Sequence, residues 1–255
     1  MTSSDSSHRI RIEHLGRMAY EPAWARQKQV HADVVAGRSP DTLLVVEHEP
    51  VITLGRRPEA AEHLLAGEPL LAARGVSLCQ TDRGGDITYH GPGQVVIYPI
   101  VRLNDHGLNL RQYVWLLEQA IIETLGRWAI DAGRDDCAVG VWVKGAGERG
   151  ADDHGAGGRA ACPGPAAADS AKIAAIGVRA SRWVTMHGLA LNVAPDLEHF
   201  KLIVPCGLAG RPVTSMRQLL GAGCPGFEQV RDALADRLVA ALGRATSARA
   251  VEQRR

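Results

Sequence analysis

A glycine-rich segment with polar side chains, from Arg83 to Gln94, is the first candidate for chemistry in this chain of 255 residues. Its sequence is RGGDITYHGPGQ, and it leads directly into the apolar run VVIYPI. Glycine lets the backbone turn sharply and brings bare N–H groups close to a ligand. Arg83, Tyr89 and His90 add polar groups beside that backbone. The segment is therefore predicted to form the wall of a binding site, and the alternative interpretation is a glycine-rich hairpin.

Cys206, in the sequence Pro205-Cys206-Gly207, is the sharpest candidate for a nucleophile. A lone cysteine is most often a small, inert core residue. Here a rigid proline and a permissive glycine flank it, which would display the thiol at the mouth of a site. Gly207 also leaves an unshielded N–H where an oxyanion could form. Because a thiol is mostly protonated at neutral pH, a nearby group must accept its proton or favour the thiolate.

Three side chains are candidates for that base, namely Lys172, His187 and His90. All lie far from Cys206 along the chain, so spacing does not choose among them, and histidine is the usual base on general grounds. Lys172 begins an apolar segment, KIAAIGV, where partial removal from water favours the neutral amine that accepts a proton. The structural alternatives are a solvated lysine at a strand end and hydrogen-bonded core histidines.

Four sequence blocks together resemble the octanoyltransferases of lipoate biosynthesis, relatives of the lipoate and biotin protein ligases. In order they are RGGDITYHGPGQ, KIAAIGV, HGLALNV and PCGL, and the resemblance spans about residues 43–220. It implies a single biotin/lipoate protein ligase-like domain with Cys206 and Lys172 as the catalytic pair. The substrate-binding residues that it implies are Arg83, Gly84, Gly85, Asp86, Ile87, Thr88, Tyr89, His90, Ala175, Ile176, Gly177, His187, Gly188, Leu189 and Ala190.

The reaction implied by the resemblance is transfer of an octanoyl group from octanoyl-acyl carrier protein to a lysine of lipoyl domains, the first step of protein lipoylation. Implied acceptors are lipoyl domains of 2-oxoacid dehydrogenase complexes and the glycine cleavage H protein. The group would pass through a thioester on Cys206, with Lys172 moving the protons and N–H groups near Gly207 and a turn at Gly177 holding the oxyanion. The donor thioester arrives activated, so neither a metal nor another cofactor is expected.

Small residues at Gly177, Gly188 and Ala190 are consistent with a tunnel for the eight-carbon chain. Burial of that chain would contribute roughly 5 kcal/mol.

Three other functions compete with this interpretation. An ATP-dependent lipoate or biotin ligase would share the fold, but the sequence has no GRGR block of the biotin-ligase kind and no P-loop. Cys206 would also have no purpose in such a ligase. A cysteine amidotransferase that moves octanoyl between lipoyl-domain proteins differs only in its donor. A non-catalytic module that binds acyl carrier protein or lipoyl domains is disfavoured by the presence of both Cys206 and Lys172.

Apolar residues at three- and four-residue steps predict two helices that pack on a core. The residues on these two stripes are Leu110, Val114, Leu117, Ile121, Leu125 and Trp128, and then Phe227, Val230, Leu234, Leu238, Val239 and Leu242. Asn109 and Gln112 predict a capping box before the first stripe, and a third helix is expected over residues 22–36.

Aliphatic runs predict six strands, at residues 43–46, 51–54, 95–101, 139–143, 173–178 and 184–193, with the first two paired as a hairpin. Strands gathered in the middle of the chain with helices interspersed predict an α+β protein. The expected architecture has mixed, largely antiparallel sheets packed with helices.

Composition narrows the class further. Lys and Arg total 29 against 28 Asp and Glu, so no overall charge favours nucleic acid binding. Residues 1–14 lack the apolar core of a signal peptide, and no run of about 18 apolar residues occurs, so we expect no membrane partner. Five scattered cysteines without a CxxC pair predict reduced thiols and a cytoplasmic location.

One domain over residues 1–255 is the expected organisation. Its ends, at residues 1–12 and 247–255, are predicted to fray. Residues 145–170 form a predicted mobile insert, because this stretch has hardly any large apolar residue to repay its ordering.

Overall fold

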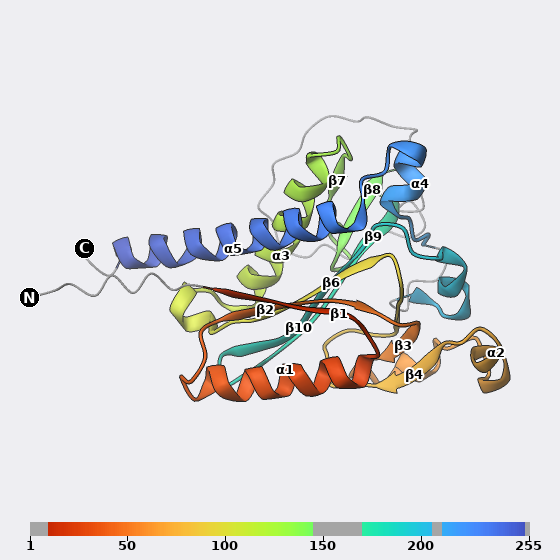
Figure 1. Cartoon of the computed structure of the whole chain (residues 1–255), viewed down its shortest axis with the longest axis horizontal. Helices are drawn as coiled ribbons and strands as arrows, with labels where there is room; N and C mark the ends of the chain where they lie inside the picture. The colour runs from red at the N-terminus through yellow and green to blue at the C-terminus, as the bar shows by residue number, and fades with distance from the viewer. Residues whose placement is uncertain (1–9, 145–169, 206–210, 253–255) are drawn as a thin grey trace, which may run out of the picture.

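The computed structural model describes residues 10–144, 170–205 and 211–252, with side chains described up to Ser247 (Figure 1). The larger of its two sheets runs in the order β1 (Arg11–Met18), β2 (Thr42–His48), β6 (Gln94–Ile100), β10 (Val184–Asn192), β9 (Ser170–Ser181), β8 (Val141–Lys144) and β7 (Ala132–Gly133). Only β1 and β2 pair in parallel, and every other neighbouring pair in this sheet is antiparallel.

A smaller sheet beside it has the order β4 (Ser77–Gln80), β3 (Val51–Leu54) and β5 (Thr88–His90). Here β3 pairs in parallel with β4 and antiparallel with β5. The short helix α2 (Glu68–Ala73) packs on this sheet through Leu71, and a cluster of buried residues lies beneath it, including Ile52, Ile87 and Tyr89. The mixed, largely antiparallel α+β architecture predicted from the sequence is confirmed.

Helices cover both faces of the larger sheet (Figure 1). On one face, α1 (Tyr20–Val35) buries Ala23, Val30 and Val34 against β2, β6 and β10. On the other face lie α3 (Leu110–Gly126) and α5 (Phe227–Glu252), which also contact each other. The remaining short helices are η1 (Pro58–Ala61), η2 (Leu103–His106), η4 (Leu197–Leu202), α4 (Met216–Leu220) and η6 (Gly221–Gly223).

The two long helices form where the apolar stripes predict them. Gln112 N–H donates to Asn109 Oδ1, and Asn109 N–H donates to Gln112 Oε1, both at 2.9 Å, so the predicted capping box is confirmed. Helix α5 continues to Glu252, past the point at residue 247 where the sequence predicts a frayed tail. Within the part of the chain that the structure describes, no helix is long and apolar enough to cross a membrane.

The predicted hairpin of the first two strands is wrong. β2 belongs to the larger sheet, where β1 and β6 already occupy both of its edges. β3 therefore has no free edge to pair with on β2, and it lies in the smaller sheet instead. The strands on either side of residues 145–169 do pair with each other, because β8 and β9 are antiparallel neighbours. The insert itself lies almost entirely outside the described residues.

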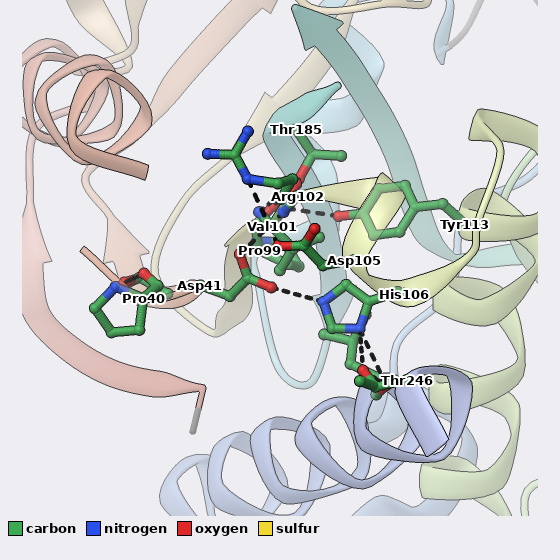
Figure 2. Close-up of polar contacts among 12 residues, drawn as sticks. Pro40, Asp41, Pro99, Val101, Arg102, Asp105, His106, Tyr113, Thr185 and Thr246 are labelled. Carbon is green, nitrogen blue, oxygen red and sulfur yellow. Dashed lines mark hydrogen bonds and ion pairs between the residues drawn. The ribbon is translucent and has the colours of Figure 1, made fainter. Parts of the chain in front are cut away.

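A polar cluster fixes the C-terminal helix at one end of the sheet (Figure 2). His106 Nε2 lies 2.6 Å from Asp41 Oδ2, just before β2, and His106 Nδ1 lies 2.7 Å from Thr246 Oγ1 on α5. The same ring nitrogen lies 3.2 Å from the backbone oxygen of Leu242. These contacts tie three segments that are far apart in the sequence.

Candidate active site

The residues singled out in the sequence converge on one cavity of about 310 Å³ between the glycine-rich segment and strands β9 and β10. Those that line it are Arg83, Gly84, Gly85, Asp86, Ile87, Thr88, His90, Lys172, Ala175, Ile176, Gly177, His187, Gly188, Leu189 and Ala190. Tyr20, Tyr98 and Val139 line it as well. Sequence reasoning missed these three, and only the fold brings them to the site.

Tyr89 is the one described member of the predicted set that does not line this cavity. Its neighbours Thr88 and His90 in β5 line the cavity, whereas Tyr89 packs against Phe200 and His199, with ring centroids 5.4 and 4.9 Å away. Successive side chains of a strand point to opposite faces, which explains this separation.

Cys206 lies outside the described residues, so its contact with Lys172 stays a prediction. Pro205, the residue immediately before it, is described. Pro205, Lys172, Ala175 and Thr88 all line a second, much smaller cavity, and the last three of these also line the main one. The chain that leads into Cys206 therefore lies beside Lys172.

The other cysteines differ in state. Cys79 and Cys224 are free thiols. Cys137, which lines the main cavity, is disulfide-bonded, and this corrects the prediction of reduced thiols throughout. Separation along the sequence carries no information on whether two thiols meet in space.

Lys172 is held firmly at the start of β9. Its N–H donates to Pro212 O, and its carbonyl accepts from Thr214 N–H, both at 2.9 Å. The side chain is buried, and Nζ donates to Val139 O at 3.1 Å. Nζ also lies 4.8 Å from the centre of the Trp142 ring, where a cation is attracted to the aromatic face. Lys172 is therefore a fixed group at the cavity, as its proposed role requires.

Glycines in the wall allow backbone segments to touch. Gly84 N–H donates to Val178 O at 3.1 Å, and a Cβ added at Gly84 would lie 2.7 Å from that oxygen. A Cβ added at Gly177 would lie 2.9 Å from Gly84 O, and one at Gly188 would lie 2.2 Å from Ile97 O. Gly177 and Gly188 are thus needed for close backbone packing, and Gly177 lies within β9, not in a turn.

Arg83 connects the glycine-rich segment to the smaller sheet. Its guanidinium NH2 group donates to Thr53 O at 2.6 Å and to Thr53 Oγ1 at 3.0 Å. Asp86, further along the segment, accepts from Ile87 N–H at 2.7 Å and lies 2.9 Å from His63 Nδ1. These bonds fix the segment's shape, so the wall is preorganised.

Neutral histidines close the side of the cavity next to α1. Burial lowers the pKa of His90 to about 3, and burial lowers that of His48, just behind it, to about 4. His48 Nε2 lies 2.7 Å from the Tyr98 hydroxyl, and His90 Nδ1 lies 3.1 Å from Gln94 Oε1. Burial also raises the pKa of Tyr98 well above its usual value. This wall carries no net charge at neutral pH, which suits an apolar chain.

His187 sits in the same wall in a strained conformation, with φ of 58°. Pairing of β10 with β6 stops at Leu189, and the His187 N–H donates instead to Gln27 Oε1 at 3.0 Å. His187 Nε2 lies 2.7 Å from Asp82 Oδ1, and Nδ1 lies 3.4 Å from the Tyr20 hydroxyl. Burial lowers the pKa of His187, and the Asp82 carboxylate partly opposes that effect. Such strain in a non-glycine residue is typical of functional sites.

Among the residues that the structure describes, no group of three or more His, Cys, Asp or Glu side chains is placed to hold a metal ion. The arrangement offers a partly apolar cavity with neutral histidines on the side next to α1, Arg83 and Asp86 in the glycine-rich wall, and a buried lysine at its edge.

Known proteins place the chain in a family. The model of the lipoyl protein ligase A/B catalytic domain matches residues 19–239. An octanoyltransferase of Chloroflexus aggregans is 43% identical over 91% of this chain and 93% of its own length. One from Solibacter usitatus is 48% identical over 82% of each chain.

Solved structures agree at the level of the fold. A putative lipoate protein ligase from T. acidophilum, with bound lipoic acid, has a TM-score of 0.61 at 15% identity, covering 91% of this chain and 85% of that one. A lipoate-protein ligase A bound with ATP gives a TM-score of 0.61 at 15% identity, covering 92% of this chain and 85% of the other. From the extent of the family match and the identity to these relatives, the chain belongs to the lipoyl protein ligase A/B catalytic-domain family.

Proposed function

We propose that this chain transfers an octanoyl group from octanoyl-acyl carrier protein to a lysine of lipoyl domains, through a thioester on Cys206. It is an acyltransferase of protein lipoylation, because relatives that match it over most of both chains are octanoyltransferases. Its acceptors are lipoyl-domain proteins. The proposal adds the carrier-protein donor, the acceptor domains of 2-oxoacid dehydrogenase complexes and the glycine cleavage H protein, and the catalytic pair.

The observation that carries the proposal is the position of Lys172. It lines both the main cavity and the small cavity that Pro205 also lines. A nucleophile at Cys206 would thus lie next to a buried amine at the edge of a ligand-sized space. The cavity volume, about 310 Å³, lies at the lower end of the range for ligand pockets, as suits a narrow chain.

In the first step, the Cys206 thiolate attacks the carbonyl carbon of the donor thioester. The bond from that carbon to the pantetheine sulfur breaks, and Lys172 gives a proton to the departing thiolate. An octanoyl-Cys206 thioester remains. Backbone N–H groups stabilise the oxyanion in such reactions, which is commonly the largest contribution to the rate.

In the second step, the acceptor lysine amine attacks the octanoyl-Cys206 carbonyl. Lys172 takes the proton of the amine, the bond to Cys206 breaks, and an amide forms. The amide is more stable than the thioester, so this step runs downhill. Both steps use an acyl group that arrives activated, and neither needs a nucleotide.

Intact-mass measurement tests the proposal. After incubation in reducing buffer with octanoyl-acyl carrier protein alone, the protein is expected to gain one octanoyl group on Cys206, and to lose it when a lipoyl domain is added. Parallel reactions with free octanoate plus ATP, and with an octanoylated lipoyl domain as donor, are expected to give no adduct. Product formed only with ATP would identify a ligase, and an adduct only from the octanoylated domain would identify an amidotransferase.

A further inference from the structure

A buried carboxylate reaches the edge of the active site through one peptide unit. Glu118 lies on α3, and its Oε1 accepts from Gly140 N–H at 3.1 Å. The carbonyl of the same peptide group, Val139 O, accepts from Lys172 Nζ at 3.1 Å. The peptide between Val139 and Gly140 therefore joins the lysine ammonium at one end to the carboxylate at the other.

The backbone at this point is shaped to fit the lysine. Gly140 has φ of 128°, a conformation that side-chain-bearing residues rarely adopt. A Cβ added there would lie 2.6 Å from Ala174 O and 3.2 Å from Lys172 Cε. Only glycine lets this peptide approach Lys172 with its carbonyl toward Nζ. The contact is thus specified by sequence as well as by the hydrogen bonds.

Glu118 is kept in place from the other side by Arg134. Arg134 Nε donates to Glu118 Oε2 at 3.1 Å, and the guanidinium also bonds Trp115 O and Gln119 Oε1 on the same helix. Burial raises the pKa of Glu118, and the Gly140 N–H and Arg134 oppose that effect. Burying a carboxylate this deeply costs folding free energy unless hydrogen-bond donors and opposite charges stabilise it.

We propose that Glu118 is a positioning residue for Lys172, acting through the peptide unit between Val139 and Gly140. A carboxylate that accepts from a peptide N–H polarises the whole group and makes its carbonyl oxygen a stronger acceptor. That oxygen holds Nζ in place at the edge of the cavity. The inference rests on the proposed role of Lys172 in proton transfer with Cys206, because the ammonium stabilises the thiolate that begins the reaction.

Other charges around Lys172 enter any pH measurement. Arg211 also contacts the ring of Trp142, on β8, with its guanidinium carbon 3.6 Å from the ring centre. Arg211 in turn lies 2.6 Å from Asp135 Oδ2, and Arg134 faces Glu118. In Glu118→Gln, Arg211 keeps its carboxylate partner whereas Arg134 faces a neutral amide, so the substitution changes the balance of charge near Lys172.

Glu118→Gln tests the inference, with Glu123→Gln as the matched control on the same helix. Glu123 pairs with Arg237 at 3.0 Å and is not among the residues that contact the Val139–Gly140 peptide. In reducing buffer at neutral pH, alkylation of Cys206 and formation of its octanoyl adduct are expected to be about tenfold slower in Glu118→Gln, since the Gly140 N–H then bonds a neutral amide oxygen instead of a carboxylate. The pH midpoint of alkylation is expected to move upward. Glu123→Gln is expected to stay within about twofold of the unchanged protein.

A double variant separates positioning from general damage. In a Lys172→Met background, Glu118→Gln is expected to cause no further loss, because its effect passes through the lysine. An equal loss in both backgrounds, or an unchanged rate and pH profile in Glu118→Gln, would overturn the inference. If Glu118→Gln does not fold, Glu118→Asp withdraws the carboxylate from Gly140 while keeping its charge, and the same slowing is expected.

The two proposals fail in different ways. If the unchanged protein forms no octanoyl adduct on Cys206, the proposed function is wrong. If the adduct forms normally and Glu118→Gln matches the control, only the positioning role is wrong.

Discussion

The pairs His187–Asp82 and His106–Asp41 are almost equal in length but lie in different regions of this molecule, and of these two pairs only the first borders the cavity. His187 Nε2 lies 2.7 Å from Asp82 Oδ1, and His106 Nε2 lies 2.6 Å from Asp41 Oδ2. The other ring nitrogen of His187, Nδ1, contacts the hydroxyl of Tyr20 in the cavity wall. In His106 the Nδ1 atom instead contacts the hydroxyl of Thr246 on helix α5 (Figure 2). The pairing chemistry is alike, so the surroundings must decide what each pair does.

The pair remote from the cavity, His106–Asp41, is called here the far pair. Together with Thr246 it has the order of groups found in a catalytic triad, namely a carboxylate, an imidazole and a hydroxyl. However, Thr246 lies within α5, and its hydroxyl also bonds Leu242 O at 3.1 Å in the same helix. Backbone N–H groups inside a helix are already bonded to carbonyls one turn away, so none is left to hold an oxyanion. The far pair therefore fastens a helix.

The cavity pair differs in its backbone. His187 has φ of 58°, while His106 ends an ordinary short helix, η2. His187 is also partnered through its N–H by a side chain of α1 instead of by the neighbouring strand. Strain of this kind persists only where surrounding contacts enforce it. A histidine–aspartate pair alone does not mark a functional site. His187 is the candidate functional histidine because it lines a cavity and has a strained backbone, and His106 is a structural one.

The largest expected effect is on activity, and it distinguishes Cys206 from Thr246 as the nucleophile. Cys206→Ala is expected to abolish both the octanoyl adduct and turnover, because no thiol remains to carry the acyl group. Thr246→Val is expected to keep both and to lose only about 1 kcal/mol of stability through its lost hydrogen bond. Intact mass, turnover and thermal unfolding measure these outcomes. An active Cys206→Ala protein would end the covalent mechanism, and a folded but inactive Thr246→Val protein would move the chemistry to the far pair.

The next effect concerns the base at the cavity. Lys172→Met is expected to slow octanoyl transfer and Cys206 alkylation at neutral pH about hundredfold, the usual scale of general acid–base catalysis. Lys144→Met, at the exposed end of β8, is the control and should change little. Alkylation rates measured across pH decide the matter. If Lys172→Met behaves like the control, His187 becomes the leading candidate for the base.

Exchanging the histidines tests the comparison itself. His187→Gln is expected to reduce kcat/KM for octanoyl transfer about tenfold with a smaller change in unfolding free energy. His106→Gln is expected to do the reverse, costing about 1–3 kcal/mol of unfolding free energy because Asp41 loses its bond to the imidazole, with nearly normal kcat/KM. Kinetics and chemical unfolding on both variants give the answer. Equal effects of the two substitutions on activity would remove the distinction between the regions.

The smallest effect is a difference in acid stability. His48 and His90 have folded-state pKa values of about 4 and 3, below the ordinary 6.5. Below pH 6.5 the unfolded chain therefore binds more protons at these two residues than the folded chain does. Stability is therefore expected to fall as pH drops from 6.5 toward 4, by at most about 1.4 kcal/mol per pH unit for each histidine. His48→Gln should make this fall shallower, because residue 48 then no longer binds a proton on unfolding. Identical slopes would mean that His48 does not titrate as described.

Much of the fold could be predicted from local patterns. The capping box of α3 and the apolar stripes of α3 and α5 depend on neighbours three or four residues apart, and the structure follows them. The β2–β3 hairpin failed for a reason that no local pattern contains. Whether a strand has a free edge depends on β1 and β6, which are distant in the sequence.

The candidate site shows the same division. The glycine-rich segment and the KIAAIG block identify most of the wall, because a ligand-facing backbone needs those residue types. Tyr89 is the exception, because alternation along β5 turns its side chain to the face opposite those of Thr88 and His90. Tyr20 and Glu118 carry no motif, since each reaches the site from a helix whose packing alone brings it there.

The hydrogen bonds at the start of β9 determine where this chain can tolerate insertions and deletions. Lys172 is bonded through both its N–H and its carbonyl to residues 212 and 214, only two residues from the start of the strand at Ser170. Insertions or deletions before Ser170 therefore do not shift the register of the strand, whereas a change of one residue after it would turn every side chain to the opposite face. The junction before Ser170 is therefore a suitable place to graft a peptide tag or recognition sequence, because the register of β9 is set by residues 212 and 214.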